Sequence, residues 1–455
     1  MKHNLLGAAR LAAILLALAV FGQAQTFTAN LSSAQEVPTN ASTATGYARV
    51  FLNETAGTIT YRVVFSGLTS NQTASHIHGP ADRGANGAVI IDTGSSGATS
   101  GTLTGTSPIT APQIALLKSQ QTYLNVHSAN FPGGEIRGQL ALARPVDHDG
   151  DGRTDPSVLR FPNVAPPGVS QITYWNLNSS TGVSTFQFGD ANQDFPSPGD
   201  FDGDGITDAV LYRAGSAATP DGRYFILRSS DNTFDVRQYG IQGDQSVARD
   251  YDGDGITDMA IFRRGASASA ATTWWIKPSS GSGEDLVIPF GLTGNGSTSY
   301  DTPVPGDYDG DGKFDVAIYR FGQTPANTFI IRNSSNGALR FEQWGNFNTD
   351  YIVPGDYDGD GKWDLAAART GATGTSQMVW WIKQSSTGTA RVQPWGISSD
   401  FPVQGDYDGD GRTDIATYRA GSPSTFWVFN SLSNTVGQIR WGTTGDFPVN
   451  RFDAR

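Results

Sequence analysis

The sequence has no cysteine among its 455 residues, and only 16% of them are charged. The absence of cysteine excludes disulfides, cysteine-ligated zinc, iron–sulfur clusters and thiol nucleophiles. Basic residues are few as well: 31 Lys and Arg stand against 43 Asp and Glu, for a formal net charge of −12. A general nucleic-acid binder would carry a basic face, so we expect no nucleic-acid partner. With five histidines in the whole sequence, no Ser-His-Asp arrangement can be assigned.

Long apolar runs are also missing, except near the start. Leu11 to Phe21 is apolar, follows Lys2 and Arg10, and ends before the small residues of Gly22-Gln23-Ala24. A run of about 11 residues is shorter than the roughly 20 that span a bilayer, and the pattern is typical of a secretory signal. We therefore predict a signal peptide at residues 1–24 and no membrane span. The expected location is extracellular, periplasmic or at the cell surface.

From about Ala143 onward the sequence repeats, and one nine-residue phrase occurs six times. Successive phrases start 53, 50, 57, 49 and 50 residues apart. Each is followed by an alternating strand, by a second strand such as TTWWIKPSS, and by a third that ends on an aromatic residue and Gly. A fourth strand, as in FPVQ, leads into the next phrase. Each unit of about 50 residues therefore holds four short strands and no helical period.

A single four-stranded unit cannot bury both faces of its sheet, but six units arranged radially can. The segment Asp446-Phe447-Pro448-Val449 copies Asp400-Phe401-Pro402-Val403, whereas the first unit lacks this lead-in strand. The later segment can therefore complete the first unit and close a ring. We predict a six-bladed β-propeller over residues 144–455. Seven blades are the alternative, if Arg144–Asp147 and the last segment each begin a blade of their own.

Residues 26–142 share none of this repeat. They are rich in Gly, Ser and Thr, and they contain alternating strands such as Thr58 to Phe65. This pattern indicates a separate antiparallel β domain of the sandwich type. The predicted fold class of the whole chain is therefore all-β.

The repeated phrase places Asp at positions 1, 3, 5 and 9, so four carboxylates would repel one another without a cation. Oxygen ligands at alternating loop positions are how proteins hold calcium, and Gly at position 6 permits the turn that directs the position-7 carbonyl inward. Magnesium fits less well, because it demands a tight octahedron. We expect about six Ca²⁺ sites, with these ligands: Asp147, Asp149, Asp151, Arg153, Asp155; Asp200, Asp202, Asp204, Ile206, Asp208; Asp250, Asp252, Asp254, Ile256, Asp258; Asp307, Asp309, Asp311, Lys313, Asp315; Asp356, Asp358, Asp360, Lys362, Asp364; Asp406, Asp408, Asp410, Arg412, Asp414.

Three of the five histidines lie in the N-terminal part. His76 and His78 are two residues apart, so on a strand both project from one face. His127 alternates with Leu124 and Val126, so it avoids the face that they bury. If the three imidazoles converge, they make a candidate site for copper or zinc. The alternative is that they only hydrogen-bond the loop that Gly79 and Pro80 close.

The repeats resemble the FG-GAP/VCBS repeats of integrin α-like propellers. Phe188-Gly189 with Pro198-Gly199-Asp200, and Trp344-Gly345 with Pro354-Gly355-Asp356, carry the resemblance together with the aspartate loops. It implies calcium loops on one rim of the ring, and an adhesive or ligand-binding scaffold without assigned catalytic residues.

The N-terminal part resembles the CHRD domain. Phe27, Gly46 and the following segments match it: Glu36-Val37-Pro38, His76-Ile77-His78-Gly79, Asn86-Gly87, Tyr123-Leu124-Asn125-Val126-His127 and Pro132-Gly133-Gly134-Glu135-Ile136-Arg137-Gly138. The histidine pattern is also similar to the copper ligands of copper–zinc superoxide dismutases. The chain offers three histidines where that copper site uses four, and it has neither the zinc ligands nor the disulfide, so we do not expect dismutase activity.

Two functions from different classes follow. The favoured one is a non-enzymatic, secreted, calcium-binding adhesion or ligand-binding protein whose partner is an extracellular protein or glycan. The alternative is a secreted enzyme, either with copper or zinc at His76, His78 and His127, or acting on polysaccharide at the propeller. No isolated acid pair outside the calcium loops supports the second version.

Overall fold

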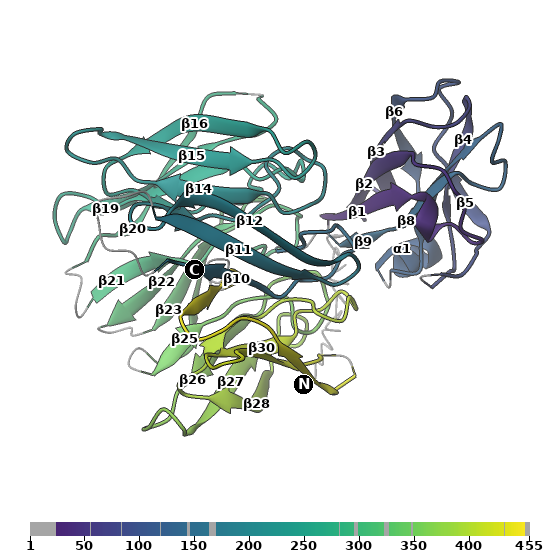
Figure 1. The fold of residues 1–455 in the computed structure, drawn as a ribbon. Coiled ribbons are helices and arrows are strands. Elements are labelled where there is room, and N and C mark those ends of the chain that lie inside the picture. The colour runs from purple at the N-terminus through teal and green to yellow at the C-terminus, as the bar shows by residue number, and fades with distance from the viewer. Residues whose placement is uncertain are drawn as a thin grey trace, which may run out of the picture.

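The computed structural model describes residues 24–450, apart from 55, 83, 119, 143–145, 163–169, 282, 295–298, 323–326, 347–348 and 432. The predicted signal peptide, except for its last residue, lies outside these ranges. The described chain is almost entirely β and forms two parts, a smaller N-terminal domain and a larger ring of sheets (Figure 1). None of the helices in the described ranges has the length and apolar character needed to cross a membrane.

The N-terminal domain is one nine-stranded sheet in the order β5-β4-β7-β8-β1-β2-β3-β6, with β9 paired to β1. The sheet is barrel-like and encloses a single core that includes Phe27, Val50, Ile77 and Leu124. The all-β class is confirmed here, although one continuous sheet provides the two faces expected of a sandwich. Its elements are β1 (Ala24–Ser32), η1 (Ser33–Gln35), β2 (Thr45–Asn53), β3 (Thr58–Ser66), β4 (Gln72–His78), β5 (Val89–Asp92), β6 (Gly101–Pro108), α1 (Ala111–Lys118), β7 (Tyr123–Ser128), β8 (Ile136–Gln139) and β9 (Ala141–Leu142).

The repeats form a propeller of six four-stranded antiparallel blades, as predicted, and not the alternative of seven. Each blade runs from a short lead-in strand to a fourth strand that alternates in exposure. In blade order the strands are β33 (Asp446–Pro448), β10 (Ser157–Arg160), β11 (Gln171–Asn178), β12 (Gly182–Asp190); β13 (Phe195–Pro196), β14 (Ala209–Arg213), β15 (Asp221–Leu227), β16 (Phe234–Ile241); β17 (Gln245–Ser246), β18 (Met259–Arg263), β19 (Ala271–Lys277), β20 (Leu286–Leu292); β21 (Ser299–Pro303), β22 (Val316–Gly322), β23 (Thr328–Arg332), β24 (Leu339–Gln343); β25 (Asp350–Ile352), β26 (Leu365–Arg369), β27 (Gln377–Lys383), β28 (Ala390–Ile397); β29 (Phe401–Pro402), β30 (Ile415–Arg419), β31 (Thr425–Phe429) and β32 (Val436–Arg440).

The ring closes where the sequence predicts. Strand β33 pairs with β10, with Val158 opposite Pro448 and Arg160 opposite Asp446, so a late segment completes the first blade. Six apolar clusters lie between neighbouring blades; the cluster between blades 3 and 4, for example, joins Phe262 and Trp274 to Ile318. Each blade therefore buries its faces against its neighbours, which is why the repeat folds as a ring.

Candidate metal sites and ligand surface

The aspartate loops connect the lead-in strand of each blade to the second strand. In blade 2 the loop lies between β13 and β14, and an isolated bridge between Gly199 and Asp208 closes its base. The glycines at positions 4 and 6 have φ between 69° and 90° in all six loops, a region that residues with a Cβ rarely adopt. The turn predicted at position 6 is therefore present, and a second one precedes it at position 4.

The carboxylates at positions 1 and 9 organise each loop. The position-1 carboxylate accepts hydrogen bonds from the amides of both glycines, at 2.5–2.9 Å. One oxygen of the position-9 carboxylate accepts the position-2 amide at 2.7–3.0 Å. The position-7 amide donates to the position-5 carboxylate at 2.8–3.0 Å. These bonds hold the carboxylates together on one side of the loop.

A hydrogen bond joins each loop to the next around the ring. The amide at position 8 donates to the position-1 carbonyl of a neighbouring blade, over 2.6–2.9 Å, as between Thr207 and Asp147 or between Thr154 and Asp406. The second of these pairs connects blade 1 to blade 6, so the six links form a closed circle. The loops therefore share one face of the propeller, as the resemblance to FG-GAP/VCBS repeats implies.

Several carboxyl groups of the loops, including all six at position 9, are buried close to other aspartates, and this changes their acidity. Desolvation by burial, reinforced by neighbouring aspartates, disfavours the charged form. The pKa of Asp200 rises to about 7, and that of Asp204 to about 8. At position 9 the pKa rises from its ordinary 3.8 to about 7 in Asp155, Asp258, Asp315 and Asp364, to about 6 in Asp208 and to about 8 in Asp414.

The loop carboxylates fit a calcium ion in spacing and donor type. In blades 1 and 2 the carboxylates at positions 1, 3 and 9 offer oxygens within 4.8 Å of one another, and in blades 3 and 4 those at positions 1, 3 and 5 do so. Oxygens on opposite sides of one Ca²⁺ lie about 5 Å apart, because Ca–O distances are 2.3–2.6 Å. Asp309 Oδ1 and Asp410 Oδ2 are buried, and neither accepts a hydrogen bond within the described ranges. The predicted position-7 carbonyls belong to residues whose amides already contact this cluster.

Sequence reasoning missed the serines that contact the loops, one in every blade and a second in five of the six blades. The first serine after the third strand donates its amide to the free oxygen of the position-9 carboxylate, at 2.6–2.7 Å in all six blades. The next serine contacts the position-3 carboxylate, as Ser335 and Ser386 do through their hydroxyls at 2.6 Å. The signal was in the repeats: Ser-Ser ends the third-strand phrase in five of the six units.

Sequence reasoning also missed one ion pair per blade. An aspartate within or directly before the lead-in strand accepts two hydrogen bonds from an arginine at or near the end of the next strand. Each aspartate side chain is at most 1% exposed. In five blades the aspartate and the arginine are 19 residues apart in the sequence, and this repeated spacing was the signal available. The sixth pair joins the two strands that close the ring, so its residues are far apart in the sequence. The pairs are Asp446–Arg160, Asp194–Arg213, Asp244–Arg263, Asp301–Arg320, Asp350–Arg369 and Asp400–Arg419.

Several of these arginines also lie over tryptophans of the third strands. Trp274 and Trp380 are fully buried, as expected of an inter-blade core. Trp275, Trp381 and Trp427 are half-buried, and an arginine guanidinium lies 5.1–5.4 Å from each ring centroid. The tryptophan faces that are not buried between blades are therefore covered by a cation from the same blade.

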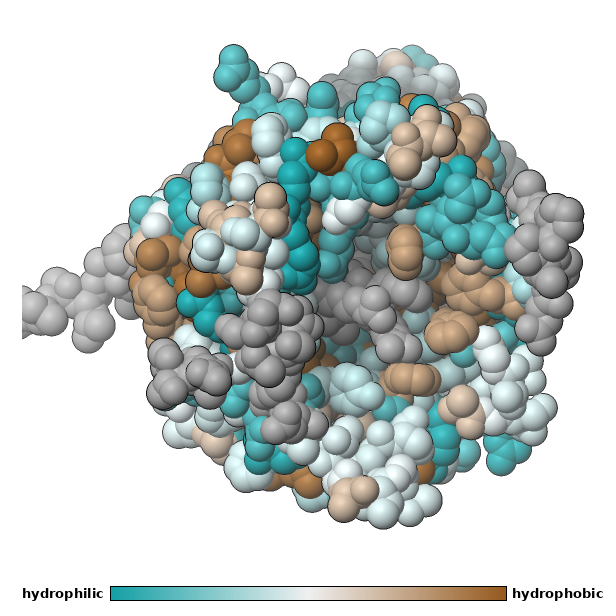
Figure 2. Space-filling model, turned by 90° about the vertical axis from the view of Figure 1, so that its left-hand side faces the viewer, coloured by the Kyte–Doolittle hydropathy of each residue, from teal (hydrophilic) through white to brown (hydrophobic). Residues whose placement is uncertain are grey.

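Aromatic side chains are instead exposed on the lead-in strands, directly after the paired aspartates. Phe195 is 62% exposed, and Tyr351 and Phe447 are each 38% exposed. Lead-in strands of blades 4, 5 and 6 line one cavity of about 270 Å³ that includes Tyr351 and Phe401, so these strands converge at the hub. The face of the propeller turned away from the N-terminal domain is hollowed at its centre (Figure 2). The aromatic residues belong to blades 5, 6, 1 and 2, which are consecutive in the ring, whereas blades 3 and 4 carry Gln245 and Thr302.

The N-terminal domain contacts two of the aspartate loops through strand β2. The Arg49 guanidinium donates to the carbonyls of Asp254 and Gly255, and it lies 4.0 Å from a carboxylate oxygen of Asp200. The Tyr47 ring lies against Gly205, where a Cβ would come within 2.2 Å of the ring. One arginine therefore places a positive charge between the loops of blades 2 and 3.

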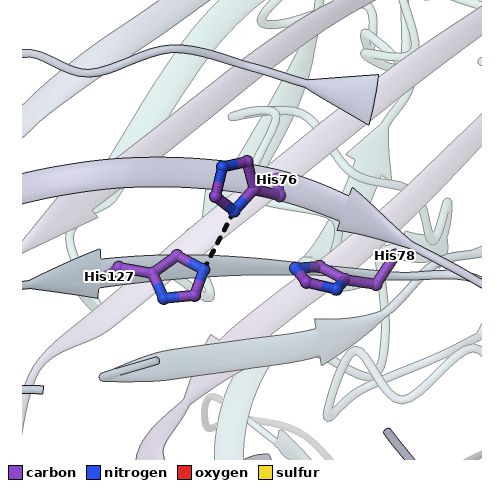
Figure 3. A group of neighbouring side chains, drawn as sticks. All are labelled: His76, His78 and His127. Carbon is purple, nitrogen blue, oxygen red and sulfur yellow. Dashed lines mark hydrogen bonds between the residues drawn. The ribbon is translucent and has the colours of Figure 1, made fainter. Parts of the chain in front are cut away.

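The three histidines of the N-terminal domain lie together, as their spacing suggests. His76 and His78 are on β4 and His127 is on the neighbouring β7, and their ring nitrogens come within 4.8 Å of one another (Figure 3). His76 Nδ1 lies 3.1 Å from His127 Nε2. Burial lowers the pKa of both His78 and His127, so these two rings are neutral at physiological pH.

The fifth histidine plays a different part. His148, at position 2 of the first loop, is in van der Waals and hydrogen-bond contact within the loop ring, with Nδ1 3.3 Å from the Thr207 carbonyl. Burial lowers its pKa to about 4. It occupies the place of the Phe or Tyr found in the other loops.

Comparisons with known proteins identify both parts. Residues 27–140 match the CHRD domain, and residues 250–318 and 356–417 match the FG-GAP-like repeat. No curated protein matches the chain. Among solved structures, a triple arginine-to-alanine mutant of AofleA from Arthrobotrys oligospora is 11% identical, with a TM-score of 0.40, over 65% of this chain and 89% of its own. A Bacteroides fragilis protein provisionally named a 6-phosphogluconolactonase is 11% identical, with a TM-score of 0.35, over 65% of this chain and 96% of its own.

Proposed function

We propose that this chain, which contains a CHRD domain and FG-GAP-like repeats, is a secreted scaffold that calcium stabilises and that binds an extracellular protein or glycan. FG-GAP-like repeats and a propeller fit a ligand-binding or adhesion scaffold. Calcium binding, secretion and an extracellular ligand are our proposals beyond this general role.

One observation carries the calcium proposal: in the loops of blades 1 to 4, three buried or half-buried carboxylates have oxygens spaced for a single dication. Burial raises the pKa of these carboxyls, since their charge is poorly compensated by the protein itself. A Ca²⁺ ion would supply the missing positive charge and accept the oxygens that hydrogen bonds leave over. Because each loop is bonded to the next, an ion in one loop would also hold the adjoining blade.

Calcium analysis tests this proposal directly. Dialysed protein in millimolar calcium should bind close to six ions per chain, one for each loop. The double variant Asp309→Asn, Asp311→Asn should bind one ion fewer, because it removes two ligands from a single loop. The matched control is Asp231→Asn, Asp285→Asn, which removes two carboxylates outside the loops and should leave the number unchanged. Fewer than one ion bound by the unaltered protein would overturn the proposal.

The hub is where we place the ligand. Tyr351 and Phe401 line its cavity beside the Asp350–Arg369 pair, so flat apolar faces adjoin charged groups there. Such a mixture suits the ring faces and hydroxyls of a sugar, or an aromatic peptide side chain.

Binding to immobilised polysaccharides and extracellular matrix proteins tests the placement. The double variant Tyr351→Ser, Phe401→Ser should bind about tenfold more weakly, because it loses two ring contacts of about 0.5–1.5 kcal/mol each. The control is Phe341→Ser on β24, a ring that is 62% exposed but lies on the fourth strand of its blade. Equal losses in both proteins would show that the ligand does not bind at the hub.

A further inference from the structure

We propose that His76, His78 and His127 form a binding site for a first-row transition-metal ion, copper in preference to zinc. This site lies in the CHRD domain, apart from the calcium loops, and it does not depend on the function proposed for the propeller.

Backbone carbonyls set the tautomers of two of the rings. His78 Nδ1 lies 3.0 Å from the Gly87 carbonyl, and His127 Nδ1 lies 3.0 Å from the Pro132 carbonyl. A carbonyl only accepts, so Nδ1 must carry the proton in both rings and Nε2 must carry the lone pair. Metal-binding histidines are commonly held in this way, with one nitrogen donating to a carbonyl and the other facing the ion.

The candidate ligand nitrogens of the three rings face one another. His127 Nε2 points at His76 Nδ1, and the His78 ring is directed toward His127 (Figure 3). His78 is 8% exposed, and its Nε2 is buried without a hydrogen-bond partner in the part of the chain that the structure describes. An unpaired buried acceptor costs about 1–3 kcal/mol, so hydrogen bonding of the loop alone does not account for this ring. A metal ion would satisfy the nitrogen.

The spacing suits a small ion with nitrogen ligands. Bonds of 2.0–2.1 Å in a tetrahedral arrangement place ligand nitrogens about 3.3 Å apart. His76 and His127 already present nitrogens 3.1 Å apart, and all three ligand atoms lie within 4.8 Å. A movement of at most about 1.5 Å by the His78 ring would complete the tripod.

The surroundings orient the His78 ring and leave one side of the cluster open. Tyr123 stacks on His78 with ring centroids 4.8 Å apart, and the Arg137 guanidinium lies 3.4 Å from the Tyr123 centroid. His76 is only half-buried, so a fourth ligand from solvent can reach the ion. Three histidines with one open position are typical of reactive rather than structural metal sites.

The chemistry of the three ligands determines which metal ions the site can hold. Three imidazole nitrogens do not suit the hard cations that require oxygen ligands, including Ca²⁺ and Mg²⁺. Imidazole binds copper, zinc, nickel and iron, and among divalent ions copper binds most tightly to a given site of this kind. We therefore expect Cu²⁺ to displace Zn²⁺.

The test is titration of the full chain with Cu²⁺ in excess calcium, which keeps the aspartate loops occupied. Every protein carries His3→Ala, because a histidine third from a free amino terminus binds copper by itself. The unaltered site should bind one Cu²⁺ per chain, and the electron paramagnetic resonance spectrum should report three imidazole nitrogens. His76→Gln, which alters the most exposed ligand, should weaken binding at least tenfold with an unchanged melting temperature of the metal-free protein.

His148→Phe is the matched control, since it removes a histidine outside the cluster and introduces an aromatic residue like those of the other loops. It should leave the copper affinity unchanged. Absence of a one-to-one copper complex, unchanged affinity in His76→Gln, or a spectrum with one nitrogen ligand would overturn the site. Tighter binding of Zn²⁺ than of Cu²⁺ in direct competition would overturn the preference. The spectrum of the unaltered cluster decides the matter even if a variant fails to fold.

Discussion

The two domains arrange buried ionisable groups in opposite ways. The propeller repeats one acidic loop six times, whereas the N-terminal domain assembles one histidine cluster from two strands. Burial raises the pKa of the position-9 aspartates and lowers the pKa of His78 and His127, so in each case it favours the uncharged form. A bound cation reverses this preference in both domains, and each donor set selects a different class of ion. We expect cations to affect the stability of the two domains differently, because the six loops join neighbouring blades while the histidines lie within a single domain.

Calcium removal should change stability most, and it should affect the propeller much more than the N-terminal domain. At a free calcium concentration ten times the dissociation constant, each site stabilises the fold by about 1.4 kcal/mol, and six sites by about 8 kcal/mol. In calorimetry, chelation should therefore shift the propeller transition down strongly and leave the transition of the N-terminal domain nearly unchanged. An equal shift of both transitions, or no shift, would show that calcium does not stabilise the propeller selectively.

The chelated propeller should also lose stability as pH rises. The position-9 carboxyls have folded pKa values of about 6 to 8, above their unfolded value near 3.9, so the fold binds protons that the unfolded chain releases. Stability of the calcium-free protein should be greatest near pH 4 and fall through pH 8, by several kcal/mol. Denaturant titrations at four pH values in chelator measure this, and the same series in calcium should not fall. A rise with pH in chelator would contradict the assigned pKa directions.

Weakening the ion pair at the ring closure should lower the free energy of unfolding by less than calcium removal does. Asp446→Asn leaves the Arg160 guanidinium, which is 41% exposed, without its carboxylate, and we expect a loss of about 2 kcal/mol. Asp235→Asn is the control, because its pair with Arg237 is about one-third exposed and should cost under about 1 kcal/mol. Urea unfolding measures both. Equal losses would show that closing the ring through β33 does not limit stability.

Removing the contact between the domains should have the smallest effect on stability. Arg49→Ala removes the guanidinium that lies between two loops, and we expect it to weaken the interface by about 1–2 kcal/mol. The exposed Arg62 on β3 provides the control variant Arg62→Ala. Small-angle X-ray scattering should report a larger radius of gyration for Arg49→Ala alone, while both transitions in calorimetry stay in place. A change in Arg62→Ala of the same size would argue against a specific contact.

The repeat made most of the propeller predictable. Asp-x-Asp-Gly-Asp-Gly at regular spacing placed the loops, and the copy of Asp400–Val403 at Asp446–Val449 placed the closing strand. The convergence of the histidines was less accessible: His127 faces His76 only because of the pairing register of β4 and β7, which shifts between Gln72 and Ala74. A one-residue slip would have turned His127 to the other face. The place of Arg49 had no local signal, since it depends on how one folded domain meets another.

The pairing of β33 with β10 has a consequence for biosynthesis. The partners Arg160 and Asp446 are 286 positions apart, so the ribosome finishes five blades before the first one can be completed. Until then the backbone amides and carbonyls along one side of β10 are bare, and they offer a template to any matching strand. The matching strand of another nascent copy would fit there equally well, so crowded translation favours exchanged dimers over aggregates of random structure.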